Sequence, residues 1–475
     1  MPDAARQPRW PMLALLGLLL AVAVVSCRQA AKLDFDFKHF YLDARYVWEH
    51  AALNPDFDNP DRDQRRQLPF YLPAVSVLLA PLTAFGPLPA AAIWTAMQVA
   101  GLACSVIALH RWFAERERGV RALALACALA LPAIYEAAKF NQLSFVILAL
   151  VLAGVGAVQR GSPLRGGALL GVAAVAKLLP ALFALWLLIE RRWKALAAFA
   201  ISAAVLAGVP CMLAFGPRQT LIYHEQWLRY NLAGTGFVVG SDAPIREHFI
   251  DHRNQSIAQV LLRLCWPEHP YRAPFQPFAL SRPMVQSIAL AVAAILLAAL
   301  AWFTLRSGLA RGAAGWHGLA ERGRADARDS HDLAGLNERP RVGAGTQNAK
   351  HKRVPCTTAL AGAARSDSGV AHGHLGRDTP AVYLIAMLVL SPLVRTYYLV
   401  WALPALVLLA DAAVHAPPGR SRALGRIGLA LWLLGMLAWT LAVARTYGVH
   451  LIMLIGLAVA VALVELPRKG SAAAG

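Results

Sequence analysis

Charged residues are scarce in this chain. Of its 475 residues only 15% are Asp, Glu, Lys or Arg, whereas 58% are hydrophobic. Soluble domains carry about 25% charged residues, which cover their surface. The shortage excludes a soluble globular domain, a disordered chain and a coiled coil. The hydrophobic residues instead form long runs of the length that crosses a membrane.

Paired cysteines and the motifs of soluble enzymes are also missing. The six cysteines include no Cys-x-x-Cys pair, so neither a zinc site nor a disulfide framework is indicated. We find no Walker A loop, no dinucleotide-binding glycine fingerprint, no HExxH and no Gly-x-Ser-x-Gly. The sequence therefore does not support the nucleotide or protease chemistry of soluble enzymes.

What the chain has in abundance is apolar runs, which predict an all-α, polytopic membrane protein of about 10–13 membrane helices, some broken or re-entrant. The first run, 10–27, follows Arg6 and Arg9; because it is long and more spans follow, we expect a signal anchor rather than a cleaved signal peptide. The later runs cover 70–86, 90–113, 120–139, 142–158, 166–190, 195–215, 283–306, 379–393, 396–415, 423–446 and 448–466.

The net charge of +19 allows a nucleic-acid partner, but Lys and Arg lie in short loops between apolar runs, where they orient a membrane protein. We therefore expect no nucleic acid. Placing the basic loops in the cytoplasm puts both termini there and puts loops 28–69 and 216–282 outside. We expect a multi-pass protein of the bacterial cytoplasmic (inner) membrane with an outward-facing active site.

Three parts of the chain are distinguished by this topology. The membrane domain covers 1–306, and C-terminal membrane helices cover 379–475. Between them, residues 307–378 are rich in Gly, Ala, Arg, Asp and His, and we predict a disordered, basic cytoplasmic insertion. An anionic-lipid or nucleic-acid role for it is the alternative.

Two apolar runs do not fit a topology in which successive runs cross the membrane in alternating directions. Both ends of 166–190 are cationic, so this run should re-enter rather than cross, with Lys177 and Pro180 at the turn. The stretch 70–113 must make one net crossing and contains several prolines. Non-helical backbone survives at membrane depth only where it lines a cavity, so a polar cavity is indicated.

Two carboxylates, Asp34 and Asp36, follow the first span directly. Either can act as a general base or be a solvated loop acid. Asp-x-Asp patterns at 34–36, 56–58 and 61–63 can also hold a divalent metal with a nucleotide diphosphate. A nucleotide-sugar site would need a soluble cytoplasmic domain, which is missing, so we predict no metal site.

Basic and amide side chains complete the candidates. Lys177 within an apolar stretch and Arg395 between two late runs are candidate phosphate ligands, unless they only snorkel or anchor at the interface. The amide pairs Asn141–Gln142 and Asn254–Gln255 suit a hydroxyl-rich ligand, or cap helices.

The order of these motifs resembles glycosyltransferase family 87, the polytopic GT-C-type mannosyltransferase-like proteins. The resemblance covers nearly the whole chain except 307–378. It rests on Asp36-Phe37-x-x-x-Tyr41, Tyr71-Leu72-Pro73, Leu79-Ala80-Pro81-Leu82, Asn141-Gln142, Ala176-Lys177-Leu178-Leu179-Pro180, Asn254-Gln255-Ser256, and Ser391-Pro392 with Trp401.

The resemblance implies transfer of a sugar, usually mannose, from a polyprenyl-phosphate donor to a lipid or glycan hydroxyl on the outer face of the membrane. It implies that Asp36, with Asp34 as second choice, deprotonates the acceptor, and that Lys177 faces the donor phosphate. The expected outcome is a single inverting displacement without cofactor or required metal. Residues expected to contact substrate are Tyr41, Asn141, Gln142, Asn254 and Gln255.

The chain departs from the family pattern after Ser391-Pro392. The family commonly shows Trp followed by His there, whereas this chain has Arg395, Tyr397 and Tyr398. We expect Arg395 or Tyr398 to contact the donor phosphate instead. Two alternatives remain: a transporter or flippase for a lipid-linked or small polar solute, since broken helices also mark transporters, and a catalytically inactive membrane scaffold.

Overall fold

The computed structural model describes residues 10–53, 71–113, 119–234, 251, 253–306, 378–391 and 395–465. Every residue of the site described below belongs to one compact unit, which covers 1–301 and 377–475. Of the second unit, Trp302–Gly376, only the end of one helix is described. The predicted insertion 307–378, apart from Asp378, and the Asp-x-Asp patterns at 56–58 and 61–63 lie outside the described residues.

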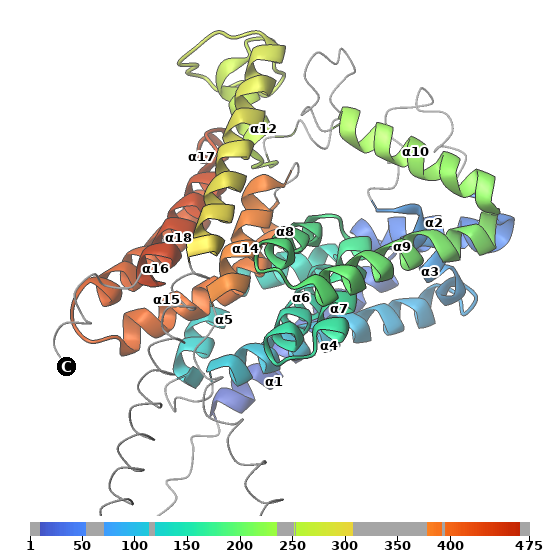
Figure 1. Cartoon of the computed structure of the whole chain (residues 1–475), viewed down its shortest axis with the longest axis horizontal. Helices are drawn as coiled ribbons and strands as arrows, with labels where there is room; N and C mark the ends of the chain where they lie inside the picture. Colours follow the sequence, from blue (N-terminus) through green and yellow to red (C-terminus); the bar gives the residue numbers. More distant parts are fainter. Residues whose placement is uncertain are drawn as a thin grey trace, which may run out of the picture. The chain divides into compact units, whose positions relative to one another are not determined.

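Helices make up the described part, which contains no β-strand (Figure 1). Seven are long and apolar enough to cross a membrane, and six shorter apolar helices accompany them, which confirms an all-α polytopic membrane protein. The elements are α1 (Trp10–Ala31), α2 (Phe35–His50), α3 (Pro73–Thr83), α4 (Pro87–Phe113), α5 (Gly119–Phe140), α6 (Ser144–Gln159), α7 (Pro163–Ala176), η2 (Leu179–Ala181), α8 (Leu182–Ile189), α9 (Trp193–Phe215), α10 (Pro217–Gly234), α12 (Ile257–Cys265), the helix Arg282–Arg306, α14 (Asp378–Leu390), η4 (Thr396–Ala402), α15 (Leu403–His415), α16 (Arg420–Ala438), α17 (Ala442–Thr446) and α18 (Val449–Glu465).

The segment from α7 to α9 reverses direction twice. A Cβ placed on Gly167 would lie 2.0 Å from the carbonyl oxygen of Ala195, and one on Gly171 would lie 2.5 Å from that of Phe199. The first turns of α7 and α9 therefore lie together and the two helices run in the same direction, so α8 must bring the chain back. The chain therefore forms a hairpin over the run for which the sequence predicts re-entry, and Lys177 lies at its tip.

The stretch 70–113 forms one short helix and one long helix. With 11 residues, α3 is too short to cross a bilayer, whereas α4 has 27 residues and can span it. Gly86 joins them with a φ of 79°, a left-handed conformation that suits glycine. The stretch therefore contains one helix that is long and apolar enough to cross, in agreement with the single crossing that the sequence predicts.

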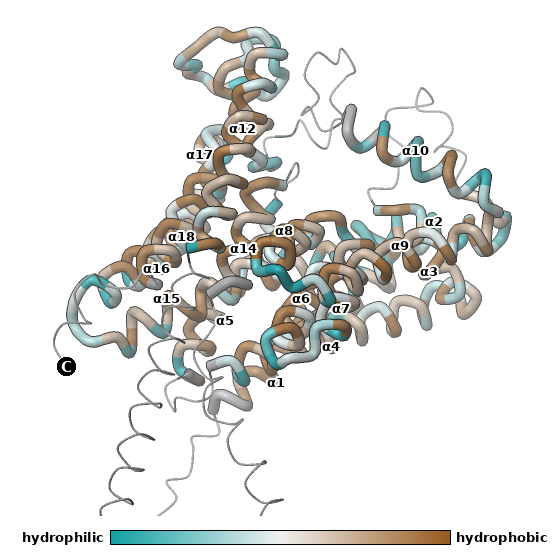
Figure 2. The backbone as a smooth tube through the Cα atoms, in the orientation of Figure 1, coloured by the Kyte–Doolittle hydropathy of each residue, from teal (hydrophilic) through white to brown (hydrophobic). Residues whose placement is uncertain are grey.

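Two helices with mixed polarity, α2 and α10, cover α3. Their apolar residues pack together: Val47 and Leu53 from the α2 region contact Ala80 of α3 and Tyr223 and Trp227 of α10. The Tyr223 hydroxyl approaches the backbone N–H of Leu53 at 3.4 Å. Figure 2 shows alternating polar and apolar residues along α10, in contrast to the mainly apolar α9. The two loops that the sequence predicts to lie outside therefore contain helices, α2 and α10, that contribute residues to the cavity described below.

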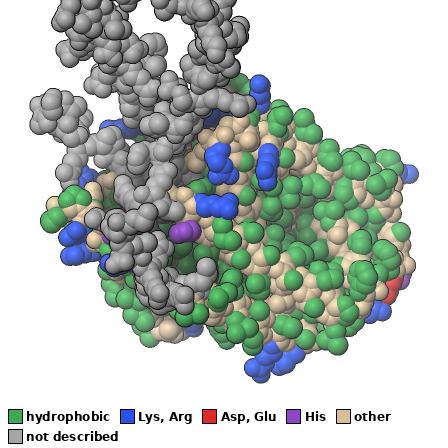
Figure 3. All heavy atoms as spheres, turned by 90° about the horizontal axis from the view of Figure 1, so that it is seen from below, with side chains coloured by type: hydrophobic (Ala, Val, Ile, Leu, Met, Phe, Trp, Pro, Cys, Tyr) green, Lys and Arg blue, Asp and Glu red, His purple; other side chains and the backbone are tan. Residues whose placement is uncertain are grey.

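Apolar side chains dominate the described surface. Figure 3 shows one face of the molecule, where hydrophobic residues prevail and Lys and Arg gather in separate groups. On α9 the exposed residues include Ile201, Val205, Val209, Met212 and Leu213. Such a helix face is stable in contact with lipid but not with water.

Candidate active site

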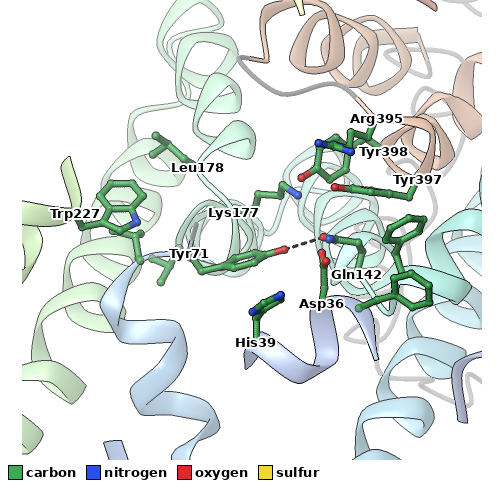
Figure 4. Close-up of a pocket in the computed structure, with 14 residues that line it drawn as sticks. Asp36, His39, Tyr71, Gln142, Lys177, Leu178, Trp227, Arg395, Tyr397 and Tyr398 are labelled. Atoms are coloured by element: carbon green, nitrogen blue, oxygen red, sulfur yellow. Dashed lines mark hydrogen bonds between the residues drawn. The ribbon is translucent and has the colours of Figure 1, made fainter. Parts of the chain in front are cut away.

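A cavity of about 310 Å³ opens at the end of the bundle where α2 begins and the α7–α8 hairpin turns. We call it the Asp36 cavity, and Figure 4 shows its labelled side chains converging from separate elements. Its lining residues are Phe35, Asp36, His39, Tyr71, Leu72, Phe140, Gln142, Val175, Lys177, Leu178, Trp227, Arg395, Tyr397 and Tyr398.

A tight turn between α1 and α2 directs Asp36 into the cavity. Leu33 and Phe35 both have positive φ, 50° and 53°, and Asp34 stands between them as the N-cap residue of α2. Non-glycine residues adopt this conformation only where the surrounding structure enforces it. Asp34 is consequently exposed, whereas Asp36 lines the cavity from the first turn of α2.

Lys177 enters the cavity from the hairpin tip. Its backbone is extended where α7 ends, and its Nζ lies 3.5 Å from the ring centroid of Tyr398. The rings of Tyr71 and Trp401 follow, with centroids at 5.7 and 5.6 Å. Aromatic faces attract an ammonium group by about 2 kcal/mol when it is desolvated. The three rings therefore hold the Lys177 charge in place without neutralising it.

Arg395 supplies a second cation from the extended residue that precedes η4. Its Nη1 lies 3.6 Å from Oδ2 of Asp251, and the exposed fractions of the two side chains are 16% and 22%. Unlike Lys177, Arg395 thus has a carboxylate partner in the described structure.

Hydrogen-bonded polar groups form another wall. The Tyr71 hydroxyl donates to Oε1 of Gln142 at 2.8 Å, and the Tyr397 hydroxyl points toward the same side chain (Figure 4). Burial raises the pKa of Tyr71 well above its ordinary value, with the charge of Asp36 adding to the shift, so its hydroxyl stays protonated. This wall can orient a hydroxyl-bearing ligand beside the carboxylate.

The electrostatic state of Asp36 follows from burial between two cations. Burial raises its pKa from 3.8 to about 7, and the positive charges of Lys177 and Arg395 act in the opposite direction. One turn further along α2, burial and the nearby Lys38 charge lower the pKa of His39, which is therefore neutral at pH 7. A carboxylate with a pKa near 7 has the proton affinity that a general base needs at neutral pH.

Five predicted site residues lie outside the cavity lining, and three of them belong to the α2 region or to the end of α5. Asp34 is exposed, and Tyr41 is buried in the α2 core with its ring centroid 5.9 Å from that of Phe37. Asn141 is fully buried; its Nδ2 donates to the backbone oxygen of Ser26 at 3.0 Å and links α5 to α1. Packing and helix connection thus account for Tyr41 and Asn141.

The second amide pair also serves the backbone. Oδ1 of Asn254 accepts the N–H of Ser256 at 3.0 Å, and Ser256 is the N-cap residue of α12. Nε2 of Gln255 donates to the carbonyl of Arg445 at 2.7 Å. The N-cap of α12 is thus Ser256 rather than either amide, and neither Asn254 nor Gln255 lines the Asp36 cavity.

The structure adds several residues to the predicted site. His39 lies three positions after Asp36, the spacing that places two side chains on one helix face. Tyr71 stands within a motif that carries the family resemblance, whereas Tyr397 stands where the chain departs from the family pattern. Trp227, on an amphipathic helix distant in sequence, offered no local signal. Among the described residues, no three His, Cys, Asp or Glu side chains gather as a metal site would require.

Comparison with known proteins decides the family. Residues 70–319, more than half of the chain, match the sequence model described as Glycosyltransferase family 87. The chain belongs to glycosyltransferase family 87. No curated protein and no solved structure matches it. Tyr71, Gln142 and Lys177 of this membrane glycosyltransferase lie within the matched segment, whereas Asp36 and Arg395 lie outside it and join the site through the fold.

Proposed function

We propose that this glycosyltransferase moves a hexose, with mannose as first choice, from a polyprenyl-phosphate donor to a hydroxyl of a lipid or glycan acceptor. The observation that carries the proposal is the Asp36 cavity itself. A carboxylate of raised pKa shares it with Lys177 and Arg395, the charges that a base and a departing phosphate need.

The donor proposal rests on the two kinds of wall in this cavity. Lys177 and Arg395 offer positive charge, while Leu72, Val175 and Leu178 offer apolar surface. Leu178 is 58% exposed at the hairpin tip, next to Lys177. An amphiphilic phosphate, with its charge inside and its isoprenoid chain along the apolar wall, fits this division better than a nucleotide sugar does.

The proposed reaction is one displacement. The Asp36 carboxylate takes the proton of the acceptor hydroxyl as its oxygen bonds to the anomeric carbon, and the carbon–oxygen bond to phosphate breaks with its electron pair leaving on phosphate. Attack from the face opposite the leaving group inverts the anomeric configuration. The Lys177 and Arg395 charges stabilise the negative charge that develops on the phosphate. No cofactor or metal is required by this proposal.

We also propose the membrane orientation and the GT-C type. The contact between Gly167 and Ala195 places the basic turns 160–165 and 191–194 at the end of α7 remote from Lys177. Basic loops face the cytoplasm, so the Asp36 cavity faces outward from the bacterial inner membrane and both termini are cytoplasmic. A broken membrane hairpin beside an outer-loop carboxylate fits the GT-C architecture that the sequence suggests.

A transporter or flippase for lipid-linked sugars is the second candidate. The broken hairpin α7–α8 favours it, because discontinuous helices also build transport sites. Transport would move an intact donor across the bilayer, whereas the transferase releases polyprenyl phosphate. Product analysis therefore separates the two functions.

The test uses the full-length protein in proteoliposomes with polyprenyl-phosphate mannose, glucose or arabinose and a membrane extract as acceptor source. We expect release of polyprenyl phosphate with one hexose, and a loss of about 10²–10⁴-fold in Asp36→Asn. Asp34→Asn is the matched control, because Asp34 is exposed two residues away, and it should retain the wild-type rate. Transfer by Asp36→Asn at the wild-type rate would refute the proposal.

A further inference from the structure

Arg395 lies between two carboxylates that belong to different elements. Its ion pair is with Asp251, at 3.6 Å between Nη1 and Oδ2. Its charge also acts on Asp36, because Arg395 is one of the two cations that oppose the rise of the Asp36 pKa. One guanidinium is therefore shared electrostatically by the proposed base and by a carboxylate outside the cavity lining.

The backbone around Asp251 is fixed by several hydrogen bonds. Its Oδ1 accepts the N–H of Arg253 at 3.0 Å, and its carbonyl accepts the N–H of Asn254 at 2.9 Å. Nη1 of the fully buried Arg263 donates to the carbonyls of Asp251 and Asn254 at 3.3 and 2.9 Å. Asp251 thus presents its carboxylate to Arg395 from a built turn rather than from a freely moving side chain.

Resting on the proposed function, we propose that Asp251 is a positioning residue that holds Arg395 away from Asp36. Without this partner, Arg395 would pair with the Asp36 carboxylate. Such a pair would occupy the lone pairs that must accept the acceptor proton, and would direct the guanidinium to the base instead of the donor phosphate. Asp251 keeps one cation for the phosphate and leaves the base unpaired.

Charge balance supports this assignment. Asp36 and Asp251 offset Lys177 and Arg395, so the four groups are neutral together before the donor phosphate arrives. Among the described residues, the charged or titratable groups beside this set are His39, Tyr71, Tyr397 and Tyr398 around Asp36, Lys139 beside Phe35, and Arg253 and Arg263 beside Asp251. Arg253 approaches the same Oδ2 of Asp251 at 4.0 Å, but its side chain is 60% exposed, so water screens its charge more than that of Arg395, which is 16% exposed.

The experiment is the pH dependence of kcat/KM for donor turnover in proteoliposomes. Asp251→Asn should move the acid limb to lower pH by about one unit, since the freed Arg395 charge lowers the Asp36 pKa, and should reduce kcat severalfold. Arg395→Gln should move the limb to higher pH. Asp251→Glu should restore the wild-type profile. General misfolding cannot shift the limb in opposite directions in two variants.

Asp411→Asn is the matched control, because Asp411 is also a half-buried carboxylate with one basic partner, His415 at 2.9 Å, on α15. It should leave the acid limb unchanged. An unmoved limb in folded Asp251→Asn, or a limb moved to lower pH in Arg395→Gln, would overturn the positioning role. If Asp251→Asn does not fold, the test uses the two other variants: the acid limb of Asp251→Glu should match the wild type, and that of Arg395→Gln should lie at higher pH. Absence of transfer by the wild type would instead defeat the proposed function.

Discussion

Two polar clusters differ in what their buried side chains contact. Asp36, Lys177 and Arg395 line the open space of the Asp36 cavity, whereas the residues of the α12 cluster, Arg263, Asn254 and Gln255, do not line it. In the α12 cluster the polar groups contact backbone: Arg263 Nε, for example, donates to the carbonyl of Thr446 at 3.3 Å. Residue type alone therefore does not separate a functional cluster from a structural one; the nature of the partner does.

Energetics explain why both clusters persist. A buried cation is costly unless hydrogen-bonded, and Arg263 meets this cost with backbone carbonyls although burial lowers its pKa to about 10, against the opposing charge of Asp251. The cations of the Asp36 cavity are held instead by aromatic rings, in the case of Lys177, and by the carboxylate of Asp251, in the case of Arg395. The comparison predicts that substitutions in the Asp36 cavity change the reaction rate, and that substitutions in the α12 cluster change the stability of the fold.

Removing the Lys177 charge should give the largest effect among the remaining variants. Lys177→Met keeps the stem of the side chain but loses the ammonium, so donor kcat/KM should fall by about 10²–10³-fold. Lys139→Met is the control, because Lys139 also lies over aromatic rings, 5.8 Å from Phe35, but pairs with Glu136 and does not line the cavity. Equal losses in both variants would remove Lys177 from the phosphate role.

The pH dependence of the wild type should follow the ionisation of Asp36. Its pKa of about 7 means that the base form decreases as the pH falls below that value. Donor and acceptor kcat/KM should therefore drop about tenfold per pH unit below pH 7. A profile that remains flat down to pH 5 would show that no carboxylate of raised pKa acts as the base.

The sequence was most informative where a residue conflicts with an apolar setting. Lys177 in a membrane run could be singled out because charge is costly there, whereas Asp36 is preferred to Asp34 through its place in the family motif. The re-entrant hairpin also followed from its two cationic ends. The predictions for Lys177 and for the hairpin rest on local composition, which determines where a chain can lie relative to lipid.

The choice between neighbouring amides could not be predicted. Asn141 and Gln142 are adjacent, and only Gln142 lines the cavity because Asn141 adopts a φ of 53° and turns its amide to Ser26. Asp251 gave no signal either, since its role depends on Arg263 and Arg395, residues distant along the chain. Tertiary packing decides both cases, and no local pattern encodes it.

Two glutamines provide a smaller, matched test of the comparison. Gln142→Leu removes the acceptor of the Tyr71 hydroxyl, and a lost hydrogen bond of about 0.5–1.5 kcal/mol should reduce kcat/KM by about two- to tenfold. Gln255→Leu removes the side-chain donor to the Arg445 carbonyl, which keeps the N–H of Gly448 at 3.2 Å, and should lower the melting temperature while the turnover of the folded protein stays unchanged. Rate assays paired with thermal unfolding of each variant check both. A loss of stability without a rate effect in Gln142→Leu, or a rate effect without a loss of stability in Gln255→Leu, would contradict the comparison.

Deleting residues 320–376 should have the smallest effect. The segment follows the family match, which ends at 319, and 307–378 contains no Phe, Tyr, Ile or Met that would enlarge an apolar core. A variant with a short Gly/Ser linker in its place should therefore transfer hexose within about twofold of the wild type, because low hydrophobicity gives such a segment little to bury. Loss of transfer with insertion intact would show that the chemistry extends beyond the Asp36 cavity. Loss of insertion would show that the segment supports the membrane helices, so the two measurements together locate any contribution it makes.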